Sequence, residues 1–401
     1  MMKQPIINGL IARRISLMNY FSVPSDFNTR TLEKFDALNQ QYSDSKVIET
    51  YGQLTVGSVL SSGRVIDVLP EVNYQALEKF VKFGLSKGIE FNYTLNPACL
   101  GNQEFTEEGI EDILALLQTL YDIGITHLTL TSPPLFELVL KSPNRFNIKA
   151  SAICEISSVH KAMFYKNLGA SRIVVDPDIT RDFRILKNIT GSFNNGVEII
   201  INNVCLKNCA YKMFHYNHEA HRTPGNDTQT ITDYYFNRCS MQKAEKISNL
   251  LKLNWIRPQD LHFYEKSGIR NFKIQGRQNV LKGNIIKALR AYFDKDFEGD
   301  LFELITLYAP YNSFQPYIDT KKLDGFVEKF FNNTEFCQEM CGKCGWCEKY
   351  AKKSIDFHQA EKLNTIALKY YGEKDKYRNL NIESIESDDV ELSLNFDFER
   401  K

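Results

Sequence analysis

The sequence lacks the long apolar run that a membrane span needs. No segment approaches about 18 consecutive apolar residues, and the first 20 residues show no apolar core or cleavage site typical of a signal peptide. Net charge is also missing, because 49 basic residues balance 49 acidic ones. We therefore expect no membrane association and no general electrostatic grip on nucleic acid.

A secretion signal is lacking, yet the chain has nine cysteines. In a reducing compartment such as the cytoplasm, clustered cysteines bind metals or carry redox chemistry more often than they form disulfides. We therefore expect a cytoplasmic, oxygen-sensitive, metal-binding protein.

Two common enzyme motifs are absent. No GxGxxG follows the first predicted strand, which argues against a dinucleotide-binding fold, and no HExxH supports a zinc-protease mechanism. What the sequence does contain is a repeated alternation of short apolar strands with helices of about ten residues. Strands are expected at 65–69, 89–95, 128–131, 148–153, 172–175, 197–201 and 271–274, and helices at 73–87, 110–121, 135–140, 159–168, 183–189, 260–266 and 278–293.

This alternation predicts an α/β fold with a parallel sheet, and a strand count near eight favours a closed TIM-like (β/α) barrel. The expected organisation is an N-terminal segment at 1–50, a barrel at 51–300 and a cysteine-rich C-terminal extension at 301–401. The polar stretch 205–253 interrupts the alternation, and so long a loop in a barrel is usually functional.

The first candidate metal site follows the most apolar strand. Cys205, Cys209 and Cys239 are spaced so that their thiolates can meet on one soft metal. Cys99 follows another strand and is a candidate fourth ligand, with Cys154 as the alternative. The competing interpretation is that these are ordinary buried cysteines.

The second candidate metal site lies in the extension. Cys337, Cys341, Cys344 and Cys347 fall within eleven residues, a density typical of Zn²⁺ or a [4Fe–4S] cluster. The first three have the spacing of radical S-adenosylmethionine enzymes, but those carry the motif in an early barrel loop. Both metals remain open for this site.

Two further groups carry possible chemistry. His215, His218 and Glu219 can bind a metal or carry protons, or can simply line a wet loop. Lys273 and Arg277 flank the end of a late strand, where a barrel presents its working loops, and we expect them to bind an anionic group of the substrate unless they form a surface pair.

The segment Phe272-Lys-Ile-Gln-Gly-Arg277 resembles the Lys-Ile-x-Gly-Arg motif of the peptidase U32 family. The segments Asn92-Tyr-Thr-Leu-Asn-Pro-Ala-Cys-Leu-Gly101 and Trp255-Ile-Arg-Pro-Gln-Asp-Leu261 look like one bacterial branch of it. The resemblance covers about residues 50–295. It implies a [4Fe–4S] cluster on Cys99, Cys205, Cys209 and Cys239, because family members that hydroxylate RNA or ubiquinone precursors hold such a cluster.

Three functions follow as hypotheses. The first is an iron–sulfur-dependent enzyme that modifies, for example by hydroxylation, a peptide, RNA or cofactor precursor, with an electron donor or partner protein. The second is a metal-dependent peptidase, as the family name suggests. The third is a non-enzymatic iron–sulfur partner protein.

Overall fold

Eight parallel strands close into a barrel in the computed structural model, which describes residues 18–57, 60, 62–64, 69–221, 234–310, 316–356 and 365. Around the barrel the strands follow the order β1-β10-β7-β6-β5-β4-β3-β2. The predicted TIM-like barrel is therefore confirmed. The strands are β1 (Asn19–Pro24), β2 (Ser45–Gly52), β3 (Glu90–Leu95), β4 (His127–Leu130), β5 (Asn147–Ala150), β6 (Ala170–Val174), β7 (Val197–Ile200) and β10 (Asn271–Lys273).

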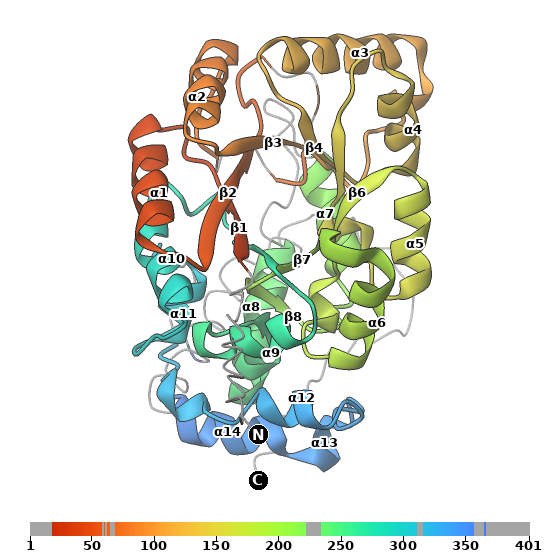
Figure 1. Ribbon diagram of the computed structural model, residues 1–401. Helices are drawn as coiled ribbons and strands as arrows, with labels where there is room; N and C mark the ends of the chain where they lie inside the picture. The colour runs from red at the N-terminus through yellow and green to blue at the C-terminus, as the bar shows by residue number, and fades with distance from the viewer. Residues whose placement is uncertain are drawn as a thin grey trace, which may run out of the picture.

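Helices connect successive strands and surround the barrel (Figure 1). Many begin at a side chain that caps the first turn, such as Asn73, Thr106 and Ser158. The helices are α1 (Thr29–Gln41), α2 (Tyr74–Ser86), α3 (Glu107–Asp122), α4 (Pro133–Lys141), α5 (Val159–Asn167), α6 (Phe183–Phe193), α9 (Leu261–Lys266) and α10 (Ile285–Asp294). Helices such as α2, α3, α6 and α10 turn an apolar stripe toward the strands, which drives the packing.

The barrel begins earlier than the sequence suggested. Strand β1 pairs with both β10 and β2, so it closes the barrel from within the segment that we expected to precede it. Its core residues Phe21 and Val23 are fully buried. The boundary placed at residue 51 is therefore a correction, because closure depends on a pairing across about 250 residues that local patterning does not reveal. Residues 65–68 of the first expected strand lie outside the described residues.

The expected helix at 278–293 begins seven residues late, as α10 at Ile285. Gly283 lies so close to the chain that a Cβ there would be 2.4 Å from the carbonyl oxygen of Leu307. Asn284 then caps the helix by accepting the backbone N–H of Lys287. The residues from Gly276 to Gly283 form turns instead.

The polar stretch after β7 is more ordered than the loop that we expected. It contains β8 (Asn202–Leu206), α7 (Lys212–His221) and α8 (Tyr234–Glu245), and it returns through β9 (Leu253–Trp255). Strands β8 and β9 pair antiparallel outside the barrel. The amphipathic pattern of α7 and α8 is weak because polar and aromatic residues occupy the faces that the two helices turn to each other.

The C-terminal segment packs at one end of the molecule, where Figure 1 shows α12, α13 and α14 together in blue. It comprises α11 (Leu301–Ile305), α12 (Glu328–Asn332), α13 (Cys341–Cys344) and α14 (Trp346–Ser354). Arg257 anchors it by donating to the Thr320 carbonyl at 2.6 Å and to Asp324 at 2.9 Å. In the described part of the chain, no helix combines the length and apolar character that crossing a membrane requires.

Candidate active site at the mouth of the barrel

The floor of the site is a charged network inside the barrel. Glu49 of β2 and Glu198 of β7 both accept from Lys149 of β5, the latter at 2.8 Å. Arg172 of β6 reaches Glu49 at 3.4 Å. Although burial acts to raise it, the positive charges of Lys149 and Arg172 hold the pKa of Glu49 well below its usual range. These residues replace the apolar layers that usually fill such a barrel.

Lys273 lies one layer nearer the mouth, at the end of β10. Its Nζ sits 3.5 Å from the centre of the Tyr51 ring and 3.8 Å from Glu198 Oε1. In the described part of the chain, neither Lys273 Nζ nor Glu198 Oε1 has a hydrogen-bond partner. Burial and the neighbouring charge of Lys149 lower the pKa of Lys273 to about 7, against the opposing pull of Glu198 and Glu49.

Arg277 is buried above this layer and is held by neutral groups. Its Nη1 donates to Thr94 Oγ1 at 2.8 Å and to Ser62 Oγ at 3.1 Å, and it also donates to Gln53 Oε1. Burial lowers the pKa of Arg277 to about 10, and the charge of Arg64 acts in the same direction. No carboxylate among the described residues is within ion-pair distance of Arg277, so its charge is left for another anion.

A small cavity adjoins Arg277 at the ends of β1 and β2. It measures about 10 Å³, room for roughly one water molecule, and Ser25 and Gln53 also line it. Gln53 Nε2 is buried without a hydrogen-bond partner in the described part of the chain. A buried unsatisfied donor beside a guanidinium suits an oxygen atom of a ligand or an ordered water.

Three of the predicted cysteines gather at the same mouth. Burial and the neighbouring thiols of Cys239 and Cys209 raise the pKa of Cys205 to about 11. Burial and Cys239 likewise raise the pKa of Cys209. These mutual effects make Cys205 on β8, Cys209 in the turn after it and Cys239 on α8 neighbours, while a metal shared by the three stays a prediction.

Two cysteines, Cys99 and Cys154, are candidates for the fourth ligand of the predicted metal site. Cys99 lies in the loop after β3, which opens at the same end of the parallel barrel as the loop after β7, and accepts the N–H of Gly101 at 3.3 Å. Cys154 is buried beside Tyr165, with its Sγ 3.7 Å from the Leu130 carbonyl oxygen. Burial raises the pKa of Cys154 to about 12. The choice between Cys99 and Cys154 stays open.

The sequence did not single out the basic and phenolic residues that lie near these thiols. Lys243 is fully buried one helical turn after Cys239 on α8, and its charge, like that of Arg64, acts to lower the pKa of Cys205. Tyr216 of α7 is also close to Cys205 and Arg64. Cys239 and Lys243 are four residues apart in the sequence. This spacing indicates that two side chains are neighbours only where the segment is a helix, and α8 was not predicted to be one.

Helix α7 is fixed to the barrel by one lysine. Lys212 Nζ contacts three carboxylates that follow β5 and β6: Asp178 at 2.7 Å, Asp176 at 3.0 Å and Glu155 at 3.1 Å. Glu155 has a left-handed backbone, with φ of 49°, a conformation that non-glycine residues seldom adopt. The lysine holds α7, with its histidines, over the ends of these strands.

The predicted histidine cluster lies on α7 and packs against α8. His215 stacks on Tyr235 with centroids 5.6 Å apart, and its Nε2 is 3.5 Å from Glu219 Oε1. The His218 ring lies 5.5 Å from the same tyrosine. This geometry suits helix packing and proton exchange between His215 and Glu219 better than metal binding.

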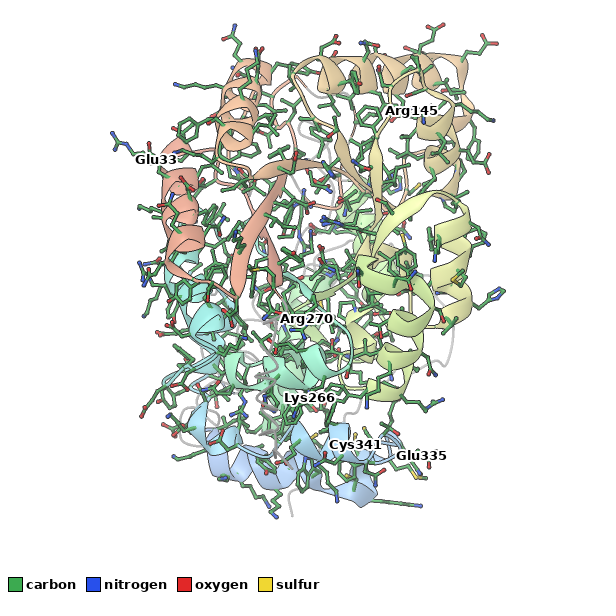
Figure 2. The ribbon with its side chains drawn as sticks, viewed as in Figure 1. Glu33, Arg145, Lys266, Arg270, Glu335 and Cys341 are labelled. Atoms are coloured by element: carbon green, nitrogen blue, oxygen red, sulfur yellow. The ribbon has the colours of Figure 1, made fainter. Side chains whose placement is uncertain are left out.

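The cysteines of the C-terminal extension lie near one another, in a group apart from those at the barrel mouth. Cys337 and Cys341 lie close enough to Cys347 to act on its pKa, which burial chiefly raises. Figure 2 shows Cys341 at the same end of the molecule as α12 and α14. Arg181, which follows β6, packs over Trp255 at 4.5 Å and faces Cys347 and Cys337. Cys344, at the end of α13, is exposed.

One glutamate joins the two cysteine-bearing segments. Glu339, between Cys337 and Cys341, accepts from Asn208 Nδ2 at 2.6 Å and pairs with Lys207 at 2.7 Å. Lys207 and Asn208 lie between Cys205 and Cys209. Both Glu339 and Asn208 have positive φ, at 62° and 54°. The two turns therefore present their polar ends to each other.

Thiol ligands suit a soft metal, but the arrangement of these side chains in the structure is not that of a metal site. Within the described ranges, no three His, Cys, Asp or Glu side chains are arranged to hold a metal ion. Cys239 and Cys209 nonetheless act on the pKa of Cys205, and the charges of Lys243 and Arg64 act to lower it, as they would stabilise a thiolate there.

A closed parallel barrel with convergent polar groups at one mouth defines a TIM-barrel protein with a candidate active site. The sequence matches the description "Peptidase family U32" over residues 69–203. A protein from Methanocaldococcus jannaschii described as "Uncharacterized protease MJ1657" is 28% identical over 336 residues, spanning 83% of this chain and 98% of that protein.

A solved structure titled "The Structure of the U32 Peptidase Mk0906" aligns with 14% identity and a TM-score of 0.46, covering 69% of this chain and 97% of that chain. That likeness is too distant to carry an argument. The sequence matches do, and they make this chain similar to peptidase family U32, the family that its motifs resemble.

Proposed function

We propose that the protein is a cytoplasmic iron–sulfur-dependent enzyme that modifies, for example by hydroxylation, a peptide, an RNA or a cofactor precursor at the barrel mouth. The observation that carries the proposal is that Cys205, Cys209 and Cys239 act on one another's pKa beside the charge of Lys243, while Arg64 acts on the pKa of both Cys205 and Arg277. Soft thiol donors suit a metal site, and a buried guanidinium that has no carboxylate partner among the described residues suits an anion site.

The roles of the chain's own residues follow from this arrangement. Cys205, Cys209 and Cys239, with Cys99 or Cys154, would hold a [4Fe–4S] cluster, which supplies electron transfer or substrate activation when bound. Arg277 and Lys273 contact the anionic substrate. His215 and Glu219 exchange a proton at the edge of the site.

The cysteines of the extension would hold a second centre, an iron–sulfur cluster or Zn²⁺. The contact of Glu339 with Lys207 and Asn208 supports a connection between the two centres. An electron donor or partner protein would then approach the exposed segment around Cys341 and Cys344.

The test is the visible absorption, iron and sulfide content of protein purified without oxygen. Cys205→Ala should lose the barrel cluster, whereas Arg277→Ala should keep it and lose substrate binding. Comparing Cys99→Ala with Cys154→Ala identifies the fourth ligand. Wild-type protein without iron, reconstituted or not, would contradict the proposal.

The second centre needs its own variant. Cys341→Ser should remove iron or zinc in an amount that adds to the loss seen in Cys205→Ala. Unchanged metal content in Cys341→Ser would mean that the extension binds no metal.

A metal-dependent peptidase is the alternative, suggested by the family description that the sequence matches. Peptide cleavage that survives Cys205→Ala and disappears in His218→Ala would support it and count against the cluster-dependent enzyme. A non-enzymatic iron–sulfur partner protein would instead keep its cluster and show no turnover.

A further inference from the structure

The interior of the barrel contains two lysines in contrasting surroundings. Lys149 donates to carboxylates on both sides, Glu49 and Glu198, and only 2% of its side chain is exposed. Lys273 lies one layer nearer the mouth, with 11% of its side chain exposed. Its Nζ makes no hydrogen bond to the described residues, and its closest acidic atom is 3.8 Å away.

The groups that face Lys273 explain why its amine stays unengaged. The Tyr51 ring covers one side of the amine, and the Tyr51 hydroxyl is already committed to the Ile274 carbonyl at 2.8 Å. Lys149 donates to Glu49 Oε1 and Glu198 Oε2, and the remaining Glu198 oxygen, Oε1, is 3.8 Å from the Lys273 amine, beyond hydrogen-bond distance. Arg277 and Lys149 add positive charge nearby, which together with burial accounts for a pKa of about 7.

We propose that Lys273 is a nucleophilic amine that captures a carbonyl group of the substrate as an imine. An amine without hydrogen-bond partners, at the mouth end of a barrel strand, has its lone pair available to a ligand. Lysines made reactive by burial and a neighbouring cation are the usual carriers of this chemistry. The inference rests on the proposed placement of substrate at the mouth, but it does not depend on the cluster.

The step balances within the site. The Nζ lone pair forms a bond to the carbonyl carbon, and the carbonyl electron pair moves to oxygen, which takes up the proton released by nitrogen. The resulting hydroxyl takes up the second proton of the nitrogen and leaves as water, and the nitrogen lone pair forms the carbon–nitrogen double bond. Glu198 Oε1, buried and without a partner in the described part of the chain, is the nearest carboxylate that can pass the proton.

Arg277 makes the capture selective. It lies four residues after Lys273, its charge acts on the Lys273 amine, and the acceptors that it meets among the described residues are neutral. The favoured ligand is therefore a small aldehyde or ketone that also carries an anionic group.

The test is reductive trapping on the full-length protein. Wild-type protein is treated at pH 7 with glyoxylate or with uncharged propanal, each with cyanoborohydride, and every labelled lysine is mapped by peptide mass spectrometry. Lys273 should be labelled about tenfold or more faster than exposed Lys82, because far more of it is neutral at this pH. Glyoxylate should label it faster than propanal, and Arg277→Ala should remove that difference.

Two variants distinguish a reactive Lys273 from one that only stabilises the fold. Lys273→Met should lose the fast label while retaining its circular-dichroism spectrum. Glu198→Gln should move the pH midpoint of labelling lower, since Glu198 favours the protonated amine. Lys149 is the internal control, buried in the same barrel but engaged by two carboxylates.

Wild-type mapping alone can overturn the proposal, even if a variant fails to fold. Labelling of Lys273 no faster than Lys149 or Lys82 would do so. Iron content measured on the same samples separates this outcome from failure of the iron–sulfur proposal, since trapping requires no metal.

Discussion

Glu49 is the residue on which the charge balance inside the barrel depends. It accepts from Ser22 at 2.7 Å, from Asn92 at 3.3 Å and from Lys149, and it pairs with Arg172. Because removing one partner leaves the opposite charge buried, Glu49→Gln should lower the free energy of unfolding by about 3–5 kcal/mol, measured by urea denaturation.

The control is Glu78→Gln on the surface of α2, where the ion pair with Lys82 is exposed and the expected loss is below about 0.5 kcal/mol. The effect of Glu49→Gln should also depend on pH. Since the folded state holds the pKa of Glu49 below its unfolded value of about 4.3, its stabilisation is present above that pH and disappears as pH falls. Equal destabilisation by the two variants would contradict this account.

Lys273 should affect the free energy of unfolding at neutral to alkaline pH, whereas Glu49 affects it at acid pH. Its folded pKa of about 7 lies below its unfolded value of about 10.4, so the unfolded chain binds more protons between these pH values. Wild-type protein should therefore gain stability relative to Lys273→Met as pH rises from 7 to 10. Urea denaturation at several pH values measures this, and a difference that stays constant would show that the amine titrates normally.

At the scale of elements, the turn between Cys205 and Cys209 docks on the turn between Cys337 and Cys341 through Glu339. Glu339→Gln removes the charge of this contact. Because the pair is partly exposed, we expect amide hydrogen exchange in both turns to rise about two- to fivefold, with no change in the barrel strands.

Lys321→Gln is the matched control, since its pair with Glu298 is exposed and lies away from both turns. Faster exchange in only one of the two turns would mean that Glu339 stabilises its own turn without joining the segments.

Most elements of the barrel could be predicted because the residues that begin, pack and end each βα unit lie close together in the sequence. The helix that begins at Tyr74, for example, has a capping asparagine, an apolar stripe and a closing glycine within fifteen residues. Helices α7 and α8 could not be predicted, since their contacts with each other are made by Tyr235, His215 and similar polar aromatic residues. Such residues occur in loops as often as in helices, so their pattern carries little information.

At the scale of the whole molecule, closure of the barrel depends on β1 and β2. A fragment that starts at residue 51 loses β1 and nearly all of β2, leaving the backbone edges of β3 and β10 unpaired. We expect the fragment 51–300 to be unfolded or aggregated by circular dichroism and sedimentation. A chain that starts at residue 18 retains all eight strands and should fold; a folded 51–300 fragment would contradict the observed closure.

The sequence by itself determined the class of fold, the likeness to peptidase family U32 and the positions of the two groups of cysteines, because strand–helix alternation and short motifs depend only on residues close in the chain. Tertiary structure alone decided which distant groups meet: Arg64 with Cys205, Lys273 with Glu198, and Glu339 with Lys207. The physical reason is that a closed barrel brings the ends of all its strands to one mouth, whatever their separation in sequence. Charge pairing at that mouth then depends on distances in space, which no local pattern encodes.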